Sequence, residues 1–347
     1  MKLCFDFLPS QETKNDLRQC LKCLLSIVLY EFFTSLPINA QPEIPLGTWR
    51  LHISYNSINS IALSDQKVFG ATRNGVMVID RSDKSIETYT KLNGLNGRGI
   101  TNLNYDQQGE QLLIVYEDGK IDMIKGDVVT SLDPTRNSPL SGSKKINHIS
   151  IHNGLAYLSA DFGVILLDLA RGEVKETWRD IGVNGATLKI FESTFKSDSI
   201  FLATDRGVLA GDLNTNLLDY RFWEKFDSGE FSDSIISVAA FNGKVYAAVS
   251  GTGLFRYESG IWTKENILQN ASLKSLDASP NALLISGDKA LWRLDGDNVI
   301  SKIESDFVHE PTMAVAENDQ LWIADDENGI VSNPGGMFVR YLPNGPS

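Results

Sequence analysis

The sequence predicts an all-β fold, a seven-bladed β-propeller of four-stranded antiparallel blades, on three observations. Two β-rich runs around a short polar turn recur seven times between residues 68 and 332. The turns lie 37 to 46 residues apart, the length typical of a four-stranded propeller blade. No long helical pattern follows residue 41.

The first copy, residues 68–80, defines the repeat. Its dipeptide Asn74-Gly75 separates the runs VFGAT and VMVID, which is typical of a β-hairpin. Glycine at such a turn adopts positive φ without steric cost, so we expect it to recur at the equivalent position. The seven turn positions are Gly75, Gly119, Gly163, Gly207, Gly253, Ala290 and Gly329.

Two further strands complete each unit. An apolar run precedes most hairpins, as in residues 58–63 and 235–241. A more polar run with aromatic side chains follows several of them, as in residues 174–180 and 220–226. Seven such units over residues 41–347 predict one closed ring, whereas an open solenoid of the same repeats would need polar caps that the sequence does not show.

The N-terminal part of this domain predicts a device for closing the ring. Residues 48–55, TWRLHISY, precede the first inner strand, and Trp49 resembles the aromatic residues of the outer strands. We expect this segment to be the outer strand of blade seven, because that pairing would hide two sheet edges. The run at residues 337–343 competes for the same place as a late strand of blade seven.

Residues 1–40 have the layout of a secretory signal peptide, with Lys14, Arg18 and Lys22 before an apolar run that ends near Ala40. A helix packed on the domain is the alternative. The predicted export places the protein in the periplasm or at the outer-membrane surface. All three cysteines fall in this leader, so the mature chain would contain no disulfide. They are Cys4, Cys20 and Cys23.

Composition narrows the class of partner. The chain is 42% hydrophobic and 22% charged, which is an ordinary globular composition. Its net charge of −12 argues against nucleic acid as a partner, because binding a phosphate backbone requires a basic face.

A search for metal ligands finds only weak patterns. His148 and His152 lie four apart on one predicted strand and face the same side, as a metal pair or as ordinary half-buried residues. Residues 212–219 place oxygen ligands at alternating positions, but Leu217 stands where a calcium loop needs glycine. Cys20 and Cys23 have metal spacing without a second ligand pair.

Other motifs also favour a structural interpretation. Asn270 begins a glycosylation sequon that chance explains, and the acidic runs 295–298 and 325–329 are hairpin turns. The glycine-rich residues 93–100 enter a strand and not the helix that a phosphate loop needs. We therefore predict no catalytic, metal or cofactor-binding residue, and no enzyme activity.

Several segments in order resemble one family. They are the Trp49–His52–Tyr55 strand and residues 93–106, 115–124, 321–331 and 341–346. Together they resemble the PorZ-like N-terminal β-propellers of the type IX secretion system, which are related to the propeller repeats of two-component regulators. The resemblance covers nearly all of residues 46–347 and no functional residue maps onto a motif.

The resemblance implies an exported propeller that works in a cell-surface attachment complex. The implied partners are a sortase-like protein and outer-membrane components, with anionic lipopolysaccharide as a further ligand. PorZ-like chains continue into a second propeller, so the resemblance implies that residues 41–347 are the first propeller of a longer chain.

Two other functions remain open at this point. Residues 92–109 echo the blade rhythm of sensory propellers in hybrid two-component regulators, which bind ligands in the periplasm. A propeller-type glycan hydrolase or lyase is the third possibility, because carboxylates from several blades can converge near a propeller axis.

Overall fold

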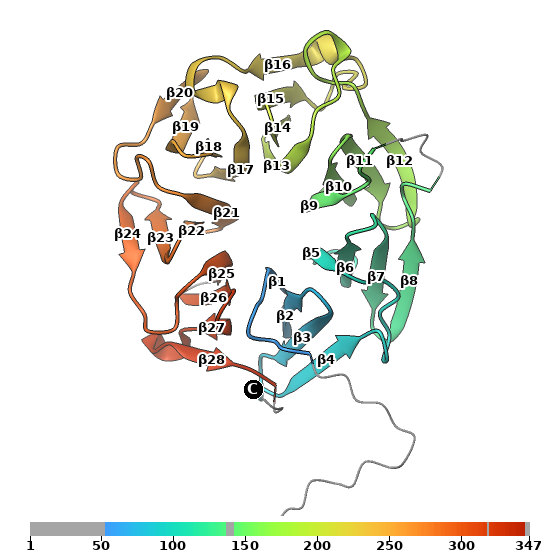
Figure 1. The fold of residues 1–347 in the computed structure, drawn as a ribbon, viewed down its shortest axis with the longest axis vertical. Coiled ribbons are helices and arrows are strands. Elements are labelled where there is room, and N and C mark those ends of the chain that lie inside the picture. Colours follow the sequence, from blue (N-terminus) through green and yellow to red (C-terminus); the bar gives the residue numbers. More distant parts are fainter. Residues whose placement is uncertain (1–52, 137–141, 318, 344–347) are drawn as a thin grey trace, which may run out of the picture. The chain divides into compact units, whose positions relative to one another are not determined.

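The computed structural model describes residues 53–136, 142–317 and 319–343. These residues form 28 strands in seven four-stranded antiparallel sheets, with four short 3-10 helices between them. The sheets follow one another around a ring, with the first strand of each nearest the centre (Figure 1). The predicted seven-bladed propeller is thereby confirmed. The predicted leader and its three cysteines lie outside the described residues.

Blades one to four run in chain order. Blade one comprises β1 (Ser60–Leu63), β2 (Lys67–Thr72), β3 (Gly75–Asp80) and β4 (Ile86–Thr90). Blade two comprises β5 (Ile100–Asp106), β6 (Gln111–Tyr116), β7 (Ile121–Lys125) and β8 (Val128–Leu132). Blade three comprises β9 (Ile146–His152), β10 (Leu155–Ala160), β11 (Gly163–Asp168) and β12 (Glu173–Trp178). Blade four comprises β13 (Ile190–Lys196), β14 (Ser199–Thr204), β15 (Gly207–Asp212) and β16 (Trp223–Phe226).

Blades five to seven continue in the same order. Blade five comprises β17 (Ile235–Phe241), β18 (Lys244–Val249), β19 (Gly253–Glu258) and β20 (Ile261–Lys264). Blade six comprises β21 (Leu273–Ser279), β22 (Ala282–Gly287), β23 (Ala290–Asp295) and β24 (Ile300–Ile303). Blade seven comprises β25 (Pro311–Glu317), β26 (Gln320–Asp325), β27 (Gly329–Ser332) and β28 (Val339–Tyr341). The 3-10 helices are η1 (Val183–Gly185), η2 (Tyr220–Phe222), η3 (Gly229–Ser232) and η4 (Pro334–Gly336). Among the described residues, no helix is long and apolar enough to cross a membrane.

The glycines at the start of each third strand serve two different purposes. Gly207 has a φ of 87°, as expected for a glycine chosen for its backbone freedom. Gly75 lies outside this left-handed region, and a Cβ there would lie 2.8 Å from Tyr55 Oη and 3.1 Å from the Tyr89 carbonyl oxygen. At Gly75 the turn needs glycine for space and not for positive φ.

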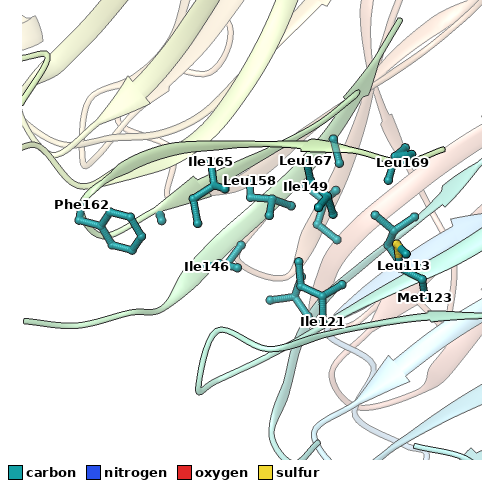
Figure 2. Packing of buried hydrophobic residues seen from close by; sticks show 13 residues of the cluster. Leu113, Ile121, Met123, Ile146, Ile149, Leu158, Phe162, Ile165, Leu167 and Leu169 are labelled. Carbon is teal, nitrogen blue, oxygen red and sulfur yellow. The ribbon is translucent and has the colours of Figure 1, made fainter. Parts of the chain in front are cut away.

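Seven clusters of buried apolar side chains fill the seven interfaces between neighbouring blades. Between blades two and three, Leu113 and Ile121 face Ile149, Leu158 and Ile165, all of them almost fully buried (Figure 2). Burying one such side chain stabilises the fold by about 1.5–3 kcal/mol. Each blade therefore has two apolar faces, and both are covered only when the ring is closed.

The prediction that residues 48–55 form the outer strand of blade seven is wrong. Blade seven takes its outer strand from its own chain segment, because β28 pairs with β27 through Ile330 and Tyr341, while residues 53–59 belong to no strand. The competing run at 337–343 therefore supplies the outer strand, and Trp49 lies outside the described residues. A hairpin closed through η4 costs less loop entropy than recruiting a strand from the far end of the domain.

The segment before β1 still joins the two ends of the ring. The Gly329 amide donates to the Asn56 carbonyl oxygen at 2.6 Å, and the Ile58 amide donates to the Asp325 carbonyl oxygen at 3.1 Å. Tyr55 and Ile58 are buried in the same cluster as Trp322 of blade seven. Closure thus rests on backbone hydrogen bonds and core packing at the β26–β27 turn.

Asp325 organises this junction. Its side chain is fully buried and accepts hydrogen bonds from four backbone amides at 2.9–3.0 Å. Two of the donors precede β25 and two lie in the β26–β27 turn; they are His309, Glu310, Glu327 and Asn328. One carboxylate therefore fixes the loop that enters blade seven and the turn that meets the N-terminal segment.

Replacing Asp325 with alanine is expected to lower the free energy of unfolding by about 3–5 kcal/mol, because it leaves four backbone amides without their acceptor at a buried carboxylate position. Asp205 occupies the equivalent turn of blade four but accepts one amide hydrogen bond, from Lys189 at 3.1 Å. Asp205→Ala should therefore cost only about 1 kcal/mol. Urea denaturation measures both, and equal losses would contradict the role given to Asp325.

Candidate functional site around the propeller axis

The inner strands β1, β5, β9, β13, β17, β21 and β25 surround the propeller axis (Figure 1). Six of them, all except β1, contain a β-bulge near their first residue. Bulges redirect the side chains that follow them. The residue after each bulge is Asn102, His148, Glu192, Ser237, Ser275 or Met313.

Polar side chains of the inner strands connect every pair of neighbouring blades. The amides of Leu103, Ala240, Leu276 and Ala314 donate to Ser60, Thr194, Ser237 and Asp277 at 2.9–3.2 Å. The side chains of Asn104, Ser150 and Thr312 donate to the carbonyl oxygens of Ile149, Ser193 and Ile58 at 2.6–2.8 Å. We call these seven contacts the inter-blade links.

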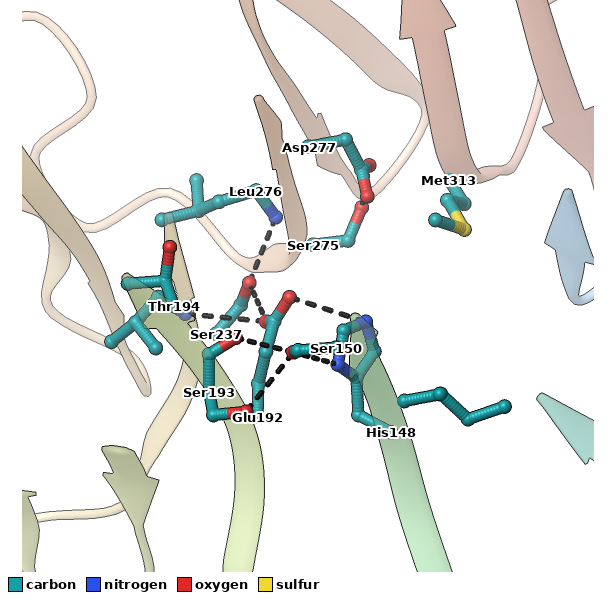
Figure 3. A network of polar contacts seen from close by, with 12 residues as sticks. His148, Ser150, Glu192, Ser193, Thr194, Ser237, Ser275, Leu276, Asp277 and Met313 are labelled. Carbon is teal, nitrogen blue, oxygen red and sulfur yellow. Dashed lines mark hydrogen bonds and ion pairs between the residues drawn. The ribbon is translucent and has the colours of Figure 1, made fainter. Parts of the chain in front are cut away.

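A continuous polar network extends these links across blades three to six (Figure 3). His148 Nε2 lies 3.4 Å from Glu192 Oε1, and the hydroxyl of Ser237 donates to Glu192 Oε2. The Val238 amide also donates to Glu192 Oε2, at 3.2 Å. Asp277 Oδ2 accepts hydrogen bonds from the hydroxyl of Ser275 at 2.7 Å and from a backbone amide of blade seven.

Burial shifts the ionisation of the three titratable groups toward their neutral forms. It lowers the pKa of His148 to about 4. It raises the pKa of Glu192 well above its usual range, although the hydrogen bonds from Ser237 and Val238 act in the opposite direction. It also raises the pKa of Asp277 to about 7. Near neutral pH, the contact between His148 and Glu192 is therefore a hydrogen bond and not an ion pair.

The network does not have the geometry of a nucleophile activated by a base. His148 Nδ1 lies 3.3 Å from Ser150 Oγ, but the Ser150 hydroxyl donates to the Ser193 carbonyl oxygen at 2.6 Å. The shorter bond directs the serine proton away from the imidazole. The two buried carboxyl groups could exchange protons with a ligand, but in this state they accept hydrogen bonds from neighbouring blades.

The structure separates the two histidines that the sequence places four apart. The His152 ring stacks on Phe195 at 4.2 Å between centroids, and its Nε2 lies 3.0 Å from Asn153 Nδ2. His148 contacts Glu192 instead. No group of three or more His, Cys, Asp or Glu side chains converges as a metal site within residues 53–136, 142–317 and 319–343. The arrangement favours the half-buried structural interpretation of both histidines.

The remaining sequence candidates occupy turns. Asp212 accepts hydrogen bonds from the backbone and side chain of Asn214, and Asp219 from the amide and guanidinium of Arg221, so both carboxylates are engaged locally. Asn270 lies exposed in the connection before β21 with a φ of 57°. Cys20 and Cys23 lie outside the described residues.

Sequence reasoning missed Glu192 and Asp277. Both fall in inner strands at positions where no other blade carries an acidic residue: the other blades have Ser, Asn, His or Met at the Glu192 position and Ala, Asn, Ser, Thr or Val at the Asp277 position. A comparison of the seven inner strands, aligned on their first apolar residue, would have shown two acidic residues in otherwise neutral columns. Only the structure shows that these two side chains are buried and lie close to neighbouring blades.

Residues 68–224 match the family model of the PorZ N-terminal β-propeller domain of the type IX secretion system. No curated protein sequence matches the chain closely enough to count as a relative.

Solved structures with the same fold include three propellers of other proteins. The first is PorZ of Porphyromonas gingivalis, with a TM-score of 0.71 at 16% identity over 86% of this chain and 39% of that chain. The extracellular domain of the hybrid two-component system BT3049 of B. thetaiotaomicron gives 0.64 at 16% identity, covering 81% and 41%. The WD40 propeller of Doa1 gives 0.62 at 11% identity, covering 80% and 92%. The chain spans well under half the length of the first two.

The fold and its inner strands define a seven-bladed propeller whose blades are joined by polar links near the axis. The predicted resemblance to the PorZ-like N-terminal β-propellers of the type IX secretion system is confirmed by the match over blades one to four.

Asp277→Asn is expected to stabilise the protein at neutral and alkaline pH. The raised pKa means that the wild type loses stability as pH rises from about 4 to about 7, because across this range the unfolded state has released a proton that the folded state still holds. The amide variant keeps an acceptor and has no charge to bury. Its free energy of unfolding should exceed that of wild type by about 1–3 kcal/mol near pH 8.

The stability difference should shrink toward about pH 4, where both side chains are neutral. Denaturation at several pH values measures this difference. Subtracting the free energy of unfolding of the wild type from that of the variant cancels the opposite pH dependence contributed by His148. Asp297→Asn, in an exposed turn, is the control and should change little at any pH. A variant less stable than wild type at pH 8 would contradict the burial of an ionisable carboxyl group.

Proposed function

We propose that this chain is an exported, non-catalytic propeller scaffold of a type IX secretion surface-attachment complex, with secretion-complex proteins as partners. The observation that carries the proposal is the family match over residues 68–224, which span blades one to four. The similar PorZ structure comes from an essential bacterial surface component of that system. The leader-like residues 1–40 support export.

The geometry near the axis supports a scaffold over an enzyme. The polar groups that could perform acid–base chemistry there accept hydrogen bonds across blade interfaces, so they are engaged in holding the ring together. A glycan hydrolase would need Glu192 and Asp277 as its acid and base. A sensory propeller shares the fold, as the BT3049 domain illustrates, but the family match favours the secretion role.

We propose anionic lipopolysaccharide as a ligand in addition to the partner proteins. One surface hollow suits a glycan. A hollow of about 380 Å³ lies at the junction of blades one and two. In it Tyr105 stacks on Phe69 at 5.6 Å between centroids, with Tyr89, Gln66 and Gln107 beside them. Aromatic faces with a few placed polar groups are typical of small-ligand sites.

Deleting the gene from its source bacterium should leave type IX cargo unprocessed and released from the cell surface. Complementation with wild type and with Glu192→Gln/Asp277→Asn should both restore attachment, because a scaffold needs only neutral acceptors at these positions. Immunoblots of cargo in cell and medium fractions measure the outcome. Unchanged cargo in the deletion strain would exclude the secretion role, and failure of the double variant alone would favour an enzyme.

Tyr105→Ala/Gln107→Ala should weaken binding of purified anionic lipopolysaccharide about tenfold or more, since it removes the aromatic surface and one amide. Leu218→Ala, an exposed apolar residue away from this hollow, is the control and should leave binding unchanged. Biolayer interferometry with immobilised lipopolysaccharide measures affinity. Equal affinity of the double variant and wild type would remove this hollow as the glycan site.

A further inference from the structure

One face of the propeller carries an uneven distribution of charge. The antiparallel strand order places two kinds of connection at this face: the turn between the second and third strands of each blade, and the segment that enters the next blade. We call it the crossover face. Its connections within residues 73–189 form one contiguous half of the ring, and those within 205–328 form the other.

The two halves of the crossover face have opposite charge. Connections of the first half contain nine Lys and Arg against five Asp and Glu, and those of the second half contain two against eleven. We call them the basic half and the acidic half. Five acidic side chains of the acidic half contact lysines or arginines of the strands, as in the Lys264–Glu230 contact at 2.8 Å and the Lys274–Glu310 contact at 2.7 Å. The acidic half still carries a net negative charge.

Exposed apolar side chains occur in both halves of the same face. Leu92 and Val183 lie in the basic half, 62% and 50% exposed. Ile267 and Phe307 lie in the acidic half, 64% and 37% exposed. All four belong to segments that enter the next blade, so each half combines charge with apolar contact area. This combination is typical of protein-binding surfaces.

We infer that the crossover face binds the crossover face of a second copy of this chain. A twofold axis lying in the face, along the boundary between the halves, places each basic half on the acidic half of the partner. The contact is then isologous, and both pairs of halves are complementary in charge. Leu92 of one copy then meets the region between Ile267 and Phe307 of the other, whereas Val183, in the last connection before the boundary, lies beside the axis. This inference goes beyond the proposed secretion role and does not depend on it.

The overall charge sets the conditions for observing the dimer. Two chains of net charge −12 repel each other at long range, which opposes association at very low salt. At about 0.1 M salt the screening length is about 10 Å, so distant charges are screened while contacting pairs still attract. At about 1 M salt the screening length is about 3 Å, and the complementary contacts weaken as well.

Paired charge reversals test this arrangement on the full chain. Arg98→Glu/Lys145→Glu makes the basic half negative, and Asp233→Lys/Asp306→Lys makes the acidic half positive; all four side chains are exposed. Sedimentation velocity at about 0.1 M salt should show a dimer for wild type and a monomer for each variant alone. An equimolar mixture of the two variants should dimerise again, because reversed halves complement each other. At about 1 M salt the wild-type dissociation constant should rise at least about tenfold.

The control is Asp127→Lys/Asp297→Lys, on turns of the opposite face. It changes the net charge by as much as Asp233→Lys/Asp306→Lys does. It should remain dimeric, since the contact lies elsewhere. Circular dichroism confirms folding of each variant. Wild type that stays monomeric at high micromolar concentration would overturn the inference, as would a mixture of the two variants that remains monomeric.

Discussion

Every blade of this protein depends on its neighbours to cover two apolar faces. A single four-stranded sheet such as β5–β8 would expose Leu113 and Ile121 on one side and Leu112 and Ile114 on the other. Burial of these side chains requires a blade on each side, and only a closed ring supplies one for all seven. Closure is therefore the constraint on which the rest of the structure depends.

Closure explains why the polar groups near the axis are structural. Blades converge there, so inner strands approach closely and their edge amides and carbonyls need partners. Side chains such as Ser237 and Asp277 supply those partners across the blade boundary. Burial then makes the carboxyl groups costly to ionise, and their neutral forms hold the ring together.

The local part of this architecture could be predicted from the sequence. The hairpins follow from period-two runs and turn residues, because both depend on neighbours in the chain. The closing strand could not, since residues 48–55 and 337–343 both carry aromatic side chains and no local signal decides between them, whereas loop entropy favours the second. The contact between His148 and Glu192 was equally hidden, because two bulged strands from different blades create it.

The inter-blade links also explain how the fold persists at low sequence identity. Ser60, Asn104, Thr194 and Asp277 perform the same task at different boundaries, with donor and acceptor roles exchanged. Any short polar side chain that reaches the next inner strand satisfies the requirement. The ring therefore constrains the size and polarity of these residues and not their identity, which accounts for a TM-score of 0.71 to the PorZ structure at 16% identity. Surface charge is free of this constraint, so ring closure does not dictate the division of the crossover face into a basic and an acidic half.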